Sequence, residues 1–230
     1  MLKYYYDLGL DTPNDDSRFL YNQVKFATSN QSNQTYAFMV PRIKTVDDNN
    51  NLYYLTQSQK ADIINRAAEQ KILNTDIIPQ DPIYTGVTVG LELTTESPSL
   101  DDIDDTYIVI ERMLSDRIST TKIQHLVSSI FINTFDSDNV TLGQTININQ
   151  ITADILDIES VRRIKTRRVD SNTGETLREI PFLNIYTFNV VYPDVDIVSS
   201  GSNISLPYFK YPFLYNQTLK NRIIVEVVDS

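Results

Sequence analysis

Residues 83–93 read IYTGVTVGLEL, and this run sets the pattern from which the rest of the chain can be interpreted. Side chains alternate along it, with Val87 and Val89 on one face and Thr88 and Glu92 on the other. A period of two places successive side chains on opposite faces of a strand. The run therefore predicts a long strand that is buried on one face only.

A helix is predicted downstream, over residues 119–134. Ile123, Val127 and Phe131 recur there at helical spacing and form one apolar stripe. Serine and threonine at its start can accept hydrogen bonds from the free amide groups of the first turn. His125 lies roughly 200° from Ile123 around the helix axis, which predicts a solvent-exposed histidine.

Further strands and a short helix complete the pattern. Asn149 is predicted to cap the short helix, and strands are predicted over Tyr107–Met113 and Val161–Val169. The turn residues of 170–175 join the last strand to residues 176–180 as a hairpin. Together these elements predict a compact α+β unit, a central sheet with two helices on one face.

Three modules are predicted along the chain, so the expected fold class is α+β with several small modules. Residues 1–78 form an N-terminal β/α module, in which residues 1–35 are polar and expected to be loop-like, with a weak strand left open over Phe19–Thr28. Thr56–Gln59 has the form of a capping box that starts a helix. Residues 79–170 hold the α+β module, and residues 171–230 form a β-rich C-terminal extension.

Composition excludes several kinds of chemistry. Cysteine is absent, which excludes disulfides, thiolate metal sites and thiol nucleophiles. His125 is the single histidine, so a two-histidine metal site is excluded. No stretch approaches the roughly 20 apolar residues that cross a bilayer, and no glycine-rich phosphate loop is present. The sequence predicts a non-enzymatic protein with no catalytic residues, no metal, no cofactor and no membrane partner.

Charge patterning sets the expectations for ligands. A net charge of -10 disfavours nucleic acid as a partner. The acidic run Asp101–Asp105 lacks the alternation and closing glutamate of a calcium-binding loop, so metal binding is the weaker interpretation. The basic run 161–168 places Arg163, Lys165 and Arg167 on one face of a strand. It is interpreted first as a solvated or edge-protecting face and second as an ionic protein interface.

A second candidate interface is the segment LPYFKYPFLY at 206–215. Its aromatic side chains lie around two prolines, which suits an extended arm laid against a partner. Packing of this arm on its own domain explains the composition equally well. The candidate contact residues are Tyr208, Phe209, Tyr211, Phe213 and Tyr215.

Local sequence between Tyr36 and Val169 resembles the baseplate J-like family, which includes a wedge protein of T-even-type phages with contractile tails. The matching segments are Tyr36–Pro41, Leu55–Lys60, Ile77–Tyr84, Thr141–Ile146, Asn149–Ile155 and Ile158–Ile164. The family pattern is an LG turn, a short capped helix and a strand entered through a glycine. Ser160 stands where the family often has that glycine.

The resemblance implies a structural role, because family members of this kind have no known catalytic residues. It implies a virion protein of the tail baseplate that is assembled in the host cytoplasm. Its expected partners are copies of itself and other wedge subunits, which build a ring around the hub and rearrange on contraction. The family's wedge protein is longer, so this chain is expected to correspond to its C-terminal part or to a shortened relative.

Two other functions stay open on the sequence. A receptor- or carbohydrate-binding tail module is the main alternative, because tyrosine-rich β proteins often bind sugars, and Tyr208 and Tyr211 are the candidate residues. A cell-wall hydrolase is the weaker alternative. Asp154, Asp157 and Glu159 are expected on the wet face of the short helix, and their spacing alone does not indicate an acid/base pair.

Overall fold

The computed structural model confirms the predicted α+β class, with three helices, strands in four sheets and a β-rich C-terminal region among the residues it describes. It describes residues 21–28, 34–41, 52–68, 76–91, 105–114, 118–191, 198–215 and 217–228. The chain divides into two compact units, residues 1–82 and 83–230. None of the described helices is long and apolar enough to cross a membrane.

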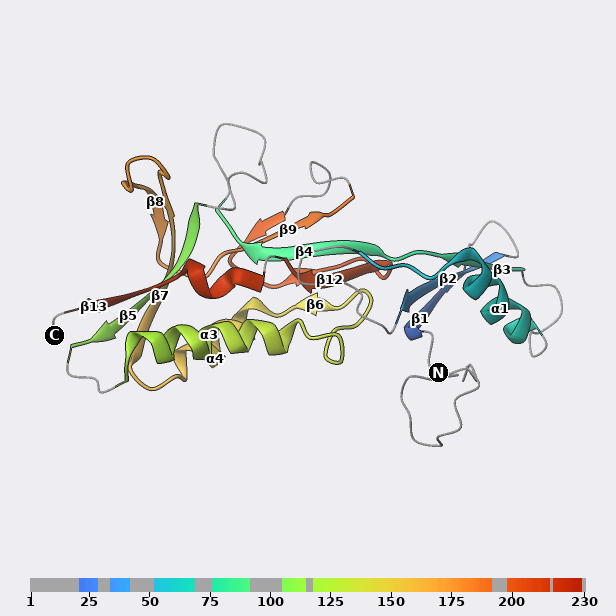
Figure 1. Ribbon diagram of the computed structural model, residues 1–230, viewed down its shortest axis with the longest axis horizontal. Coiled ribbons are helices and arrows are strands. Elements are labelled where there is room, and N and C mark those ends of the chain that lie inside the picture. Colours follow the sequence, from blue (N-terminus) through green and yellow to red (C-terminus); the bar gives the residue numbers. More distant parts are fainter. Residues whose placement is uncertain are drawn as a thin grey trace. The chain divides into compact units, whose positions relative to one another are not determined.

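A three-stranded sheet and one helix make up the described part of the first unit (Figure 1). β1 (Tyr21–Thr28) pairs antiparallel with β2 (Gln34–Pro41). β2 pairs parallel with β3 (Asp76–Gln80). A parallel pair needs a crossover connection, and α1 (Gln57–Ala68) lies in that connection.

The helix of the first unit begins with the predicted capping box. The Thr56 N–H donates to Gln59 Oε1 at 2.9 Å, and the Gln59 N–H donates to Thr56 Oγ1 at 3.2 Å. These reciprocal bonds satisfy two amide groups that have no partner within the helix. Ile63 then packs against Ala37 and Met39, so the apolar side of α1 faces the sheet.

One four-stranded sheet of the second unit has the strand order β10-β9-β4-β12. β4 (Ile83–Val89) pairs antiparallel with β9 (Ile185–Asn189) and parallel with β12 (Lys210–Leu214). β10 (Val198–Ser200) pairs with the other edge of β9. Every residue of β4 after Ile83 is buried, so the prediction of a half-buried strand was wrong, and β4 is shorter than predicted.

Two glycines explain why the second face of β4 is buried. A Cβ added to Gly86 would lie 2.7 Å from Cζ of Phe188, and one added to Gly90 would lie 2.9 Å from Cβ of Tyr186. Only a residue without a side chain leaves room for these rings to approach the strand. The alternation with glycine therefore marks close aromatic packing and not a solvent-exposed face.

The other four-stranded sheet has the order β13-β5-β7-β8. β5 (Thr106–Met113) pairs parallel with β13 (Ile223–Val228) and antiparallel with β7 (Val161–Val169). β8 (Thr176–Ile180) pairs antiparallel with β7, which confirms the predicted hairpin. Both sheets take strands from each side of residue 170, where two modules were predicted to meet.

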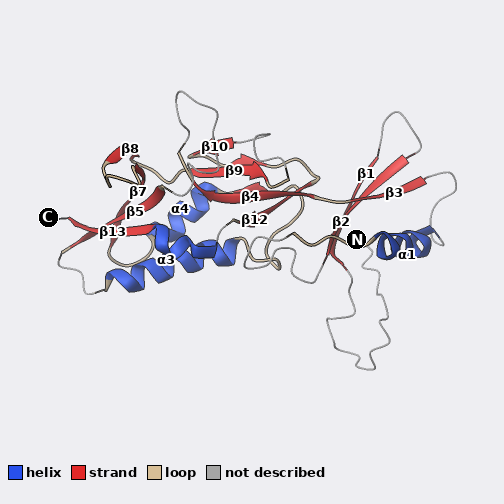
Figure 2. Ribbon diagram, turned by 45° about the horizontal axis from the view of Figure 1, so that its top comes forward, coloured by secondary structure: helices blue, strands red, loops and turns tan. Residues whose placement is uncertain are grey.

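Two helices lie on one face of this second sheet, as Figures 1 and 2 show. α3 (Thr120–Thr134) packs against β13 and against α4 (Ile148–Leu156), which packs in turn on β7. Ile123, Val127 and Ile151 are at most 1% exposed, so both helices close the core, and the predicted stripe of α3 is confirmed.

The caps of these helices agree with the sequence in one case and correct it in the other. The side chain of Ser119 accepts a hydrogen bond from the Lys122 N–H, as predicted for α3. The cap of α4 is Asn147, whose Oδ1 accepts from the Gln150 N–H. The prediction of Asn149 was wrong, because the helix starts two residues earlier, at Ile148, and buries this first isoleucine.

Short elements complete the described part of the second unit. β6 (Thr145–Ile146) pairs antiparallel with β11 (Ile204–Ser205), and the 3-10 helix η2 (Gln217–Arg222) precedes the last strand. The turn before β6 donates from the Gly143 N–H to the carbonyl of Lys210 at 2.8 Å. This bond covers part of the outer edge of β12.

A buried asparagine joins the two four-stranded sheets. Asn184 lies just before β9 and is 5% exposed. Its Nδ2 donates to the carbonyl of Gly90, which directly follows β4, and to Oγ of Ser199 in β10. Its backbone N–H donates to Oγ1 of Thr166 in β7 at 2.9 Å, and that hydroxyl donates to the carbonyl of Phe182. One residue thus links β4, β10 and β7.

Removing the Asn184 amide is predicted to destabilise the fold. Asn184→Ala leaves a buried carbonyl and a hydroxyl without their donor, which is expected to cost about 2 kcal/mol of unfolding free energy. Asn184→Asp keeps the shape but cannot donate, so it is expected to cost at least as much. Urea unfolding measures both variants, and a wild-type stability for Asn184→Asp would contradict the hydrogen-bonding role.

Candidate functional site

The basic strand β7 lies within a ladder of ion pairs. Nζ of Lys165 is 2.6 Å from Oε1 of Glu111 and 2.9 Å from Oε1 of Glu179. Arg167 pairs with Glu179 at 2.6 Å and also contacts both carboxylate oxygens of Glu226. We refer to this set as the charge ladder; its members are Glu111, Arg163, Lys165, Arg167, Glu179 and Glu226.

Strand register explains how the ladder forms. Arg163 lies directly opposite Glu111 of β5, and Arg167 lies directly opposite Glu179 of β8. Residues opposite each other in antiparallel strands share a face, and opposite charges in such pairs stabilise the sheet. The predicted common face of the three basic residues is therefore confirmed. β7 pairs on both sides, so the interpretation as edge protection was wrong.

The centre of the ladder is partly buried, and three of its members are held in their charged forms. The side chains of Glu111, Lys165 and Arg167 are 12%, 18% and 17% exposed, whereas Arg163 is 63% exposed. The hydrogen bond to Glu111, helped by the one to Glu179, raises the pKa of Lys165. The hydrogen bond from Lys165 lowers the pKa of Glu179, and Glu226 raises the pKa of Arg167. The ion pairs thus favour the charged forms of Lys165, Arg167 and Glu179.

The composition of the ladder limits what it can bind. Three cationic side chains face three carboxylates, and each cation lies within 3.8 Å of a carboxylate oxygen. Such a balanced set offers little net attraction for a phosphate, which is recognised by unbalanced positive charge. An ionic protein interface could use only Arg163, the one basic member with an exposed head group. The ladder therefore acts as a structural feature of the sheet.

The aromatic segment supplies buried core residues at its centre. Tyr211 and Phe213 lie in β12 and are 1% and 5% exposed. Their rings meet Tyr84 edge to face, with centroids 5.8 Å and 6.4 Å away. Neither side chain is accessible to a partner, so the prediction that they form an interface was wrong for both. This part of the segment packs on its own domain and is not an arm laid against a partner.

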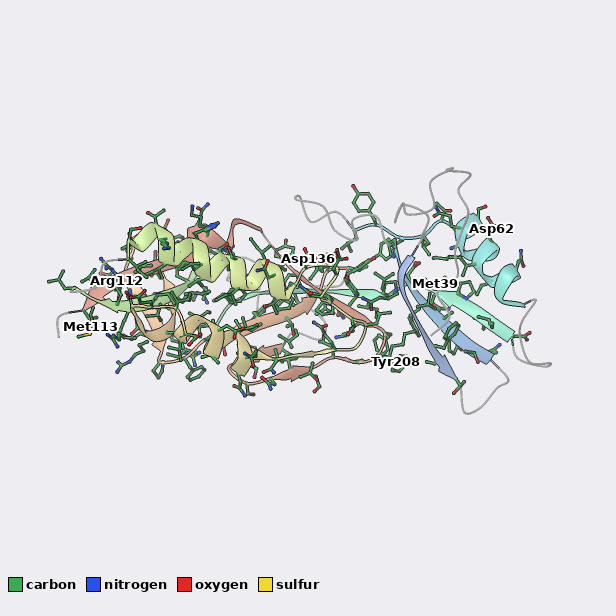
Figure 3. All side chains as sticks on the ribbon, turned by 90° about the horizontal axis from the view of Figure 1, so that it is seen from below. Met39, Asp62, Arg112, Met113, Asp136 and Tyr208 are labelled. Carbon is green, nitrogen blue, oxygen red and sulfur yellow. The ribbon has the colours of Figure 1, made fainter. Side chains whose placement is uncertain are left out.

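The two ends of the aromatic segment differ from its centre. Tyr208 is 45% exposed, and its ring stacks edge to face on Phe209 at 5.2 Å. Tyr215 is partly buried, with its ring 5.0 Å from that of Phe188. Figure 3 shows Tyr208 far from Arg112, near opposite ends of the second unit. Tyr208 is the member of the segment that remains available for contact.

Groups considered for catalysis or metal binding do not converge. His125, Asp154, Asp157 and Glu159 are all exposed, as predicted. Within the part of the chain that the structure describes, no group of three or more potential metal ligands comes together. The acidic run was also a weak metal candidate, and residues 101–104 of it lie outside the described residues. No reaction can be built from the described positions of these residues.

A separate ion pair lies in the first unit and was not predicted. Nζ of Lys60 on α1 is 2.7 Å from Oδ2 of Asp81, with side chains 4% and 41% exposed. Burial, and then the negative charge of Asp81, raise the pKa of the Tyr54 hydroxyl. The bond anchors α1 to the chain just after β3, which is a structural role.

Comparison with known proteins adds no relative. None of the protein-family models searched matches this chain. No curated protein matches it either. Functional conclusions therefore depend on the residues themselves and on the resemblance in the local sequence.

Removal of the central cation of the ladder is predicted to destabilise the second unit. Lys165→Met leaves Glu111 and Glu179 without their shared partner in a partly buried place, at an expected cost of about 2 kcal/mol. Arg163→Met is the matched control and is expected to change the unfolding free energy by at most about 0.5 kcal/mol. Denaturant unfolding measures both. Equal losses of unfolding free energy in the two variants would show that burial does not determine how much each ion pair contributes to stability.

The ladder also predicts a dependence of stability on pH. The folded-state pKa of Glu179 lies below its ordinary value of 4.5, so its contribution is present above that value and is lost as pH falls through the folded pKa. Glu179→Gln cannot ionise and is expected to lose less stability than wild type on acidification from pH 7 to about pH 3. Glu175→Gln, outside the ladder, is the control. Parallel curves for wild type and Glu179→Gln would refute the prediction.

Proposed function

We propose that this chain is a structural subunit of a phage contractile-tail baseplate, a wedge component that forms a ring around the hub. In this role it contacts copies of itself and other wedge subunits, and it rearranges when the tail contracts. The proposal places the protein in the virion and assigns it no reaction. Its support is the resemblance to the baseplate J-like family together with one backbone observation.

That observation is the conformation of Ser160. Among the described residues it is the one non-glycine residue with a positive φ, at 82°, and it is 9% exposed. Glycine adopts this region without the steric cost that a Cβ brings. Ser160 stands where the family pattern has glycine, so the residue that departs from the pattern keeps the backbone shape that the pattern requires.

The neighbouring turn supports the same proposal. Gly143 of the LG turn has a φ of 65°, and the capped helix α4 follows it. β7 then begins at Val161, directly after Ser160. The order of LG turn, capped helix, positive-φ residue and strand follows the family pattern. This agreement in order supports the resemblance better than a similar amino-acid composition would.

The alternative of a carbohydrate- or receptor-binding module has less support. Aromatic platforms that bind sugars must be accessible, and Tyr211 is buried in the core. Tyr208 alone remains exposed among the two residues considered for this role. A glycan screen with Tyr208→Ala as its control tests the alternative directly, and binding that this substitution removes would favour it.

Sedimentation velocity of the purified chain over a wide concentration range tests the proposed role. A ring-forming subunit is expected to show a reversible dimer or larger species as concentration rises. Ser160→Gly is the control, because it is expected to relieve backbone strain and raise stability by about 1 kcal/mol without changing association. A monomer at every concentration would contradict self-association.

A further inference from the structure

The strand β13 is held at the edge of its sheet by one neighbour. It is the first strand in the order β13-β5-β7-β8 and, among the described strands, pairs only with β5. Ile223 is buried, but the residues after it are partly buried or exposed, and Val227 is 43% exposed. β12, the other parallel strand at a sheet edge, is buried along its whole length. β13 is therefore the less firmly embedded of these two strands.

Departure of β13 would leave the rest of its sheet paired. β5 is joined on its other side to β7, from Thr106 to Arg112. Arg167, which contacts Glu226 of β13, also contacts Glu179 of β8 at 2.6 Å and would keep that partner. The loss is thus confined to the contacts that β13 itself makes. A segment of this kind can open locally at a lower cost than unfolding of the whole unit.

Polar contacts and strand register define what fits beside β5. Nε2 of Gln124 donates to the carbonyl of Ile223 at 2.7 Å. Arg167 donates to both carboxylate oxygens of Glu226, at 2.5 Å and 3.1 Å. The parallel register is continuous over Ile223–Val228, without a bulge. The edge of β5 therefore recognises an apolar strand with one glutamate, in one direction and one register.

The segment that satisfies all of these groups is β13, and every copy of the chain carries one. We propose that copies of this protein exchange β13, so that β5 of one copy accepts the β13 of a neighbouring copy in the same parallel register. Arg167 of the accepting copy then pairs with Glu226 of the neighbouring copy. Reciprocal exchange between two copies gives a closed dimer, and one-way exchange around a set of copies gives a ring. The inference rests on the proposed function, because it names the contact by which copies associate.

Exchange between copies conserves the contacts of β13. The burial of Ile223, the ion pair of Glu226 and the hydrogen bonds to β5 form with the neighbour as they form within one chain. The closed and exchanged states therefore differ little in contact energy, which is why exchange of an identical element is a low-cost route to oligomers. Association entropy opposes exchange, and a higher protein concentration offsets it.

Disulfide trapping between two variants tests the exchange, since the wild-type chain has no cysteine. Val109→Cys and Ile224→Cys are purified separately, mixed and mildly oxidised. Val109 and Ile224 lie opposite each other in the parallel register, at a strand spacing that a disulfide can span. Val109→Cys mixed with Val227→Cys is the matched control, because residue 227 is out of register and on the opposite face. The control is expected to give about tenfold less interchain product.

The doubly substituted chain, with Val109→Cys and Ile224→Cys together, locks β13 onto its own β5 when it is oxidised at low concentration. The locked chain is expected to sediment as a monomer, and reduction is expected to restore the association of wild type, which also shows that the substitutions are tolerated. Association of wild type without interchain product above the control, or association of the locked chain, would overturn the exchange and leave the proposed function standing. A wild type that stays monomeric and variants that give no such product would contradict both.

Discussion

The hydrogen bonds of Asn184 are the constraint on which the second unit depends, because they join two sheets that share no strand. Thr166 of β7 receives the Asn184 backbone N–H, while the side-chain amide holds the end of β4. Buried polar groups are tolerated only when satisfied, and a satisfied network fixes one arrangement of the elements around it. A single residue outside any helix or strand thus bonds both to β7 and to the end of β4.

The two four-stranded sheets cover one of their faces in different ways. In the first sheet, glycines in β4 admit the rings of Phe188 and Tyr186, so one face is closed by aromatic packing. In the second sheet, the face away from the helices carries the charge ladder, whose central members partly cover one another. A polar ladder of this kind adds specificity of register, since a slip by one residue would separate Arg163 from Glu111 and Arg167 from Glu179.

Features encoded by neighbouring residues were predictable, whereas features made by distant ones were not. The capping box, α3 and the hairpin after β7 depend on residues within a few positions of one another, and all were confirmed. The acids of the ladder come from β5, β8 and β13, and no sequence period connects them to β7. The burial of Tyr211 could not be predicted from the composition of its segment either. It is buried because its strand pairs with β4, which is distant in sequence. Glu179, within the predicted hairpin, was the one ladder acid that register could have found.

The parallel pairing of β12 and β13 constrains the order in which the protein can be made and folded. β12 joins β4 across 127 positions, from Ile83 to Lys210, and β13 joins β5 across 115, from Ile108 to Ile223. Contacts this distant in sequence are slow to form, since a long loop must close first. During synthesis on the ribosome both sheets must wait for these late strands, with β4 and β5 each lacking a neighbour until then. The nascent chain therefore passes through a stage in which its core strands are open to pairing with the wrong partner.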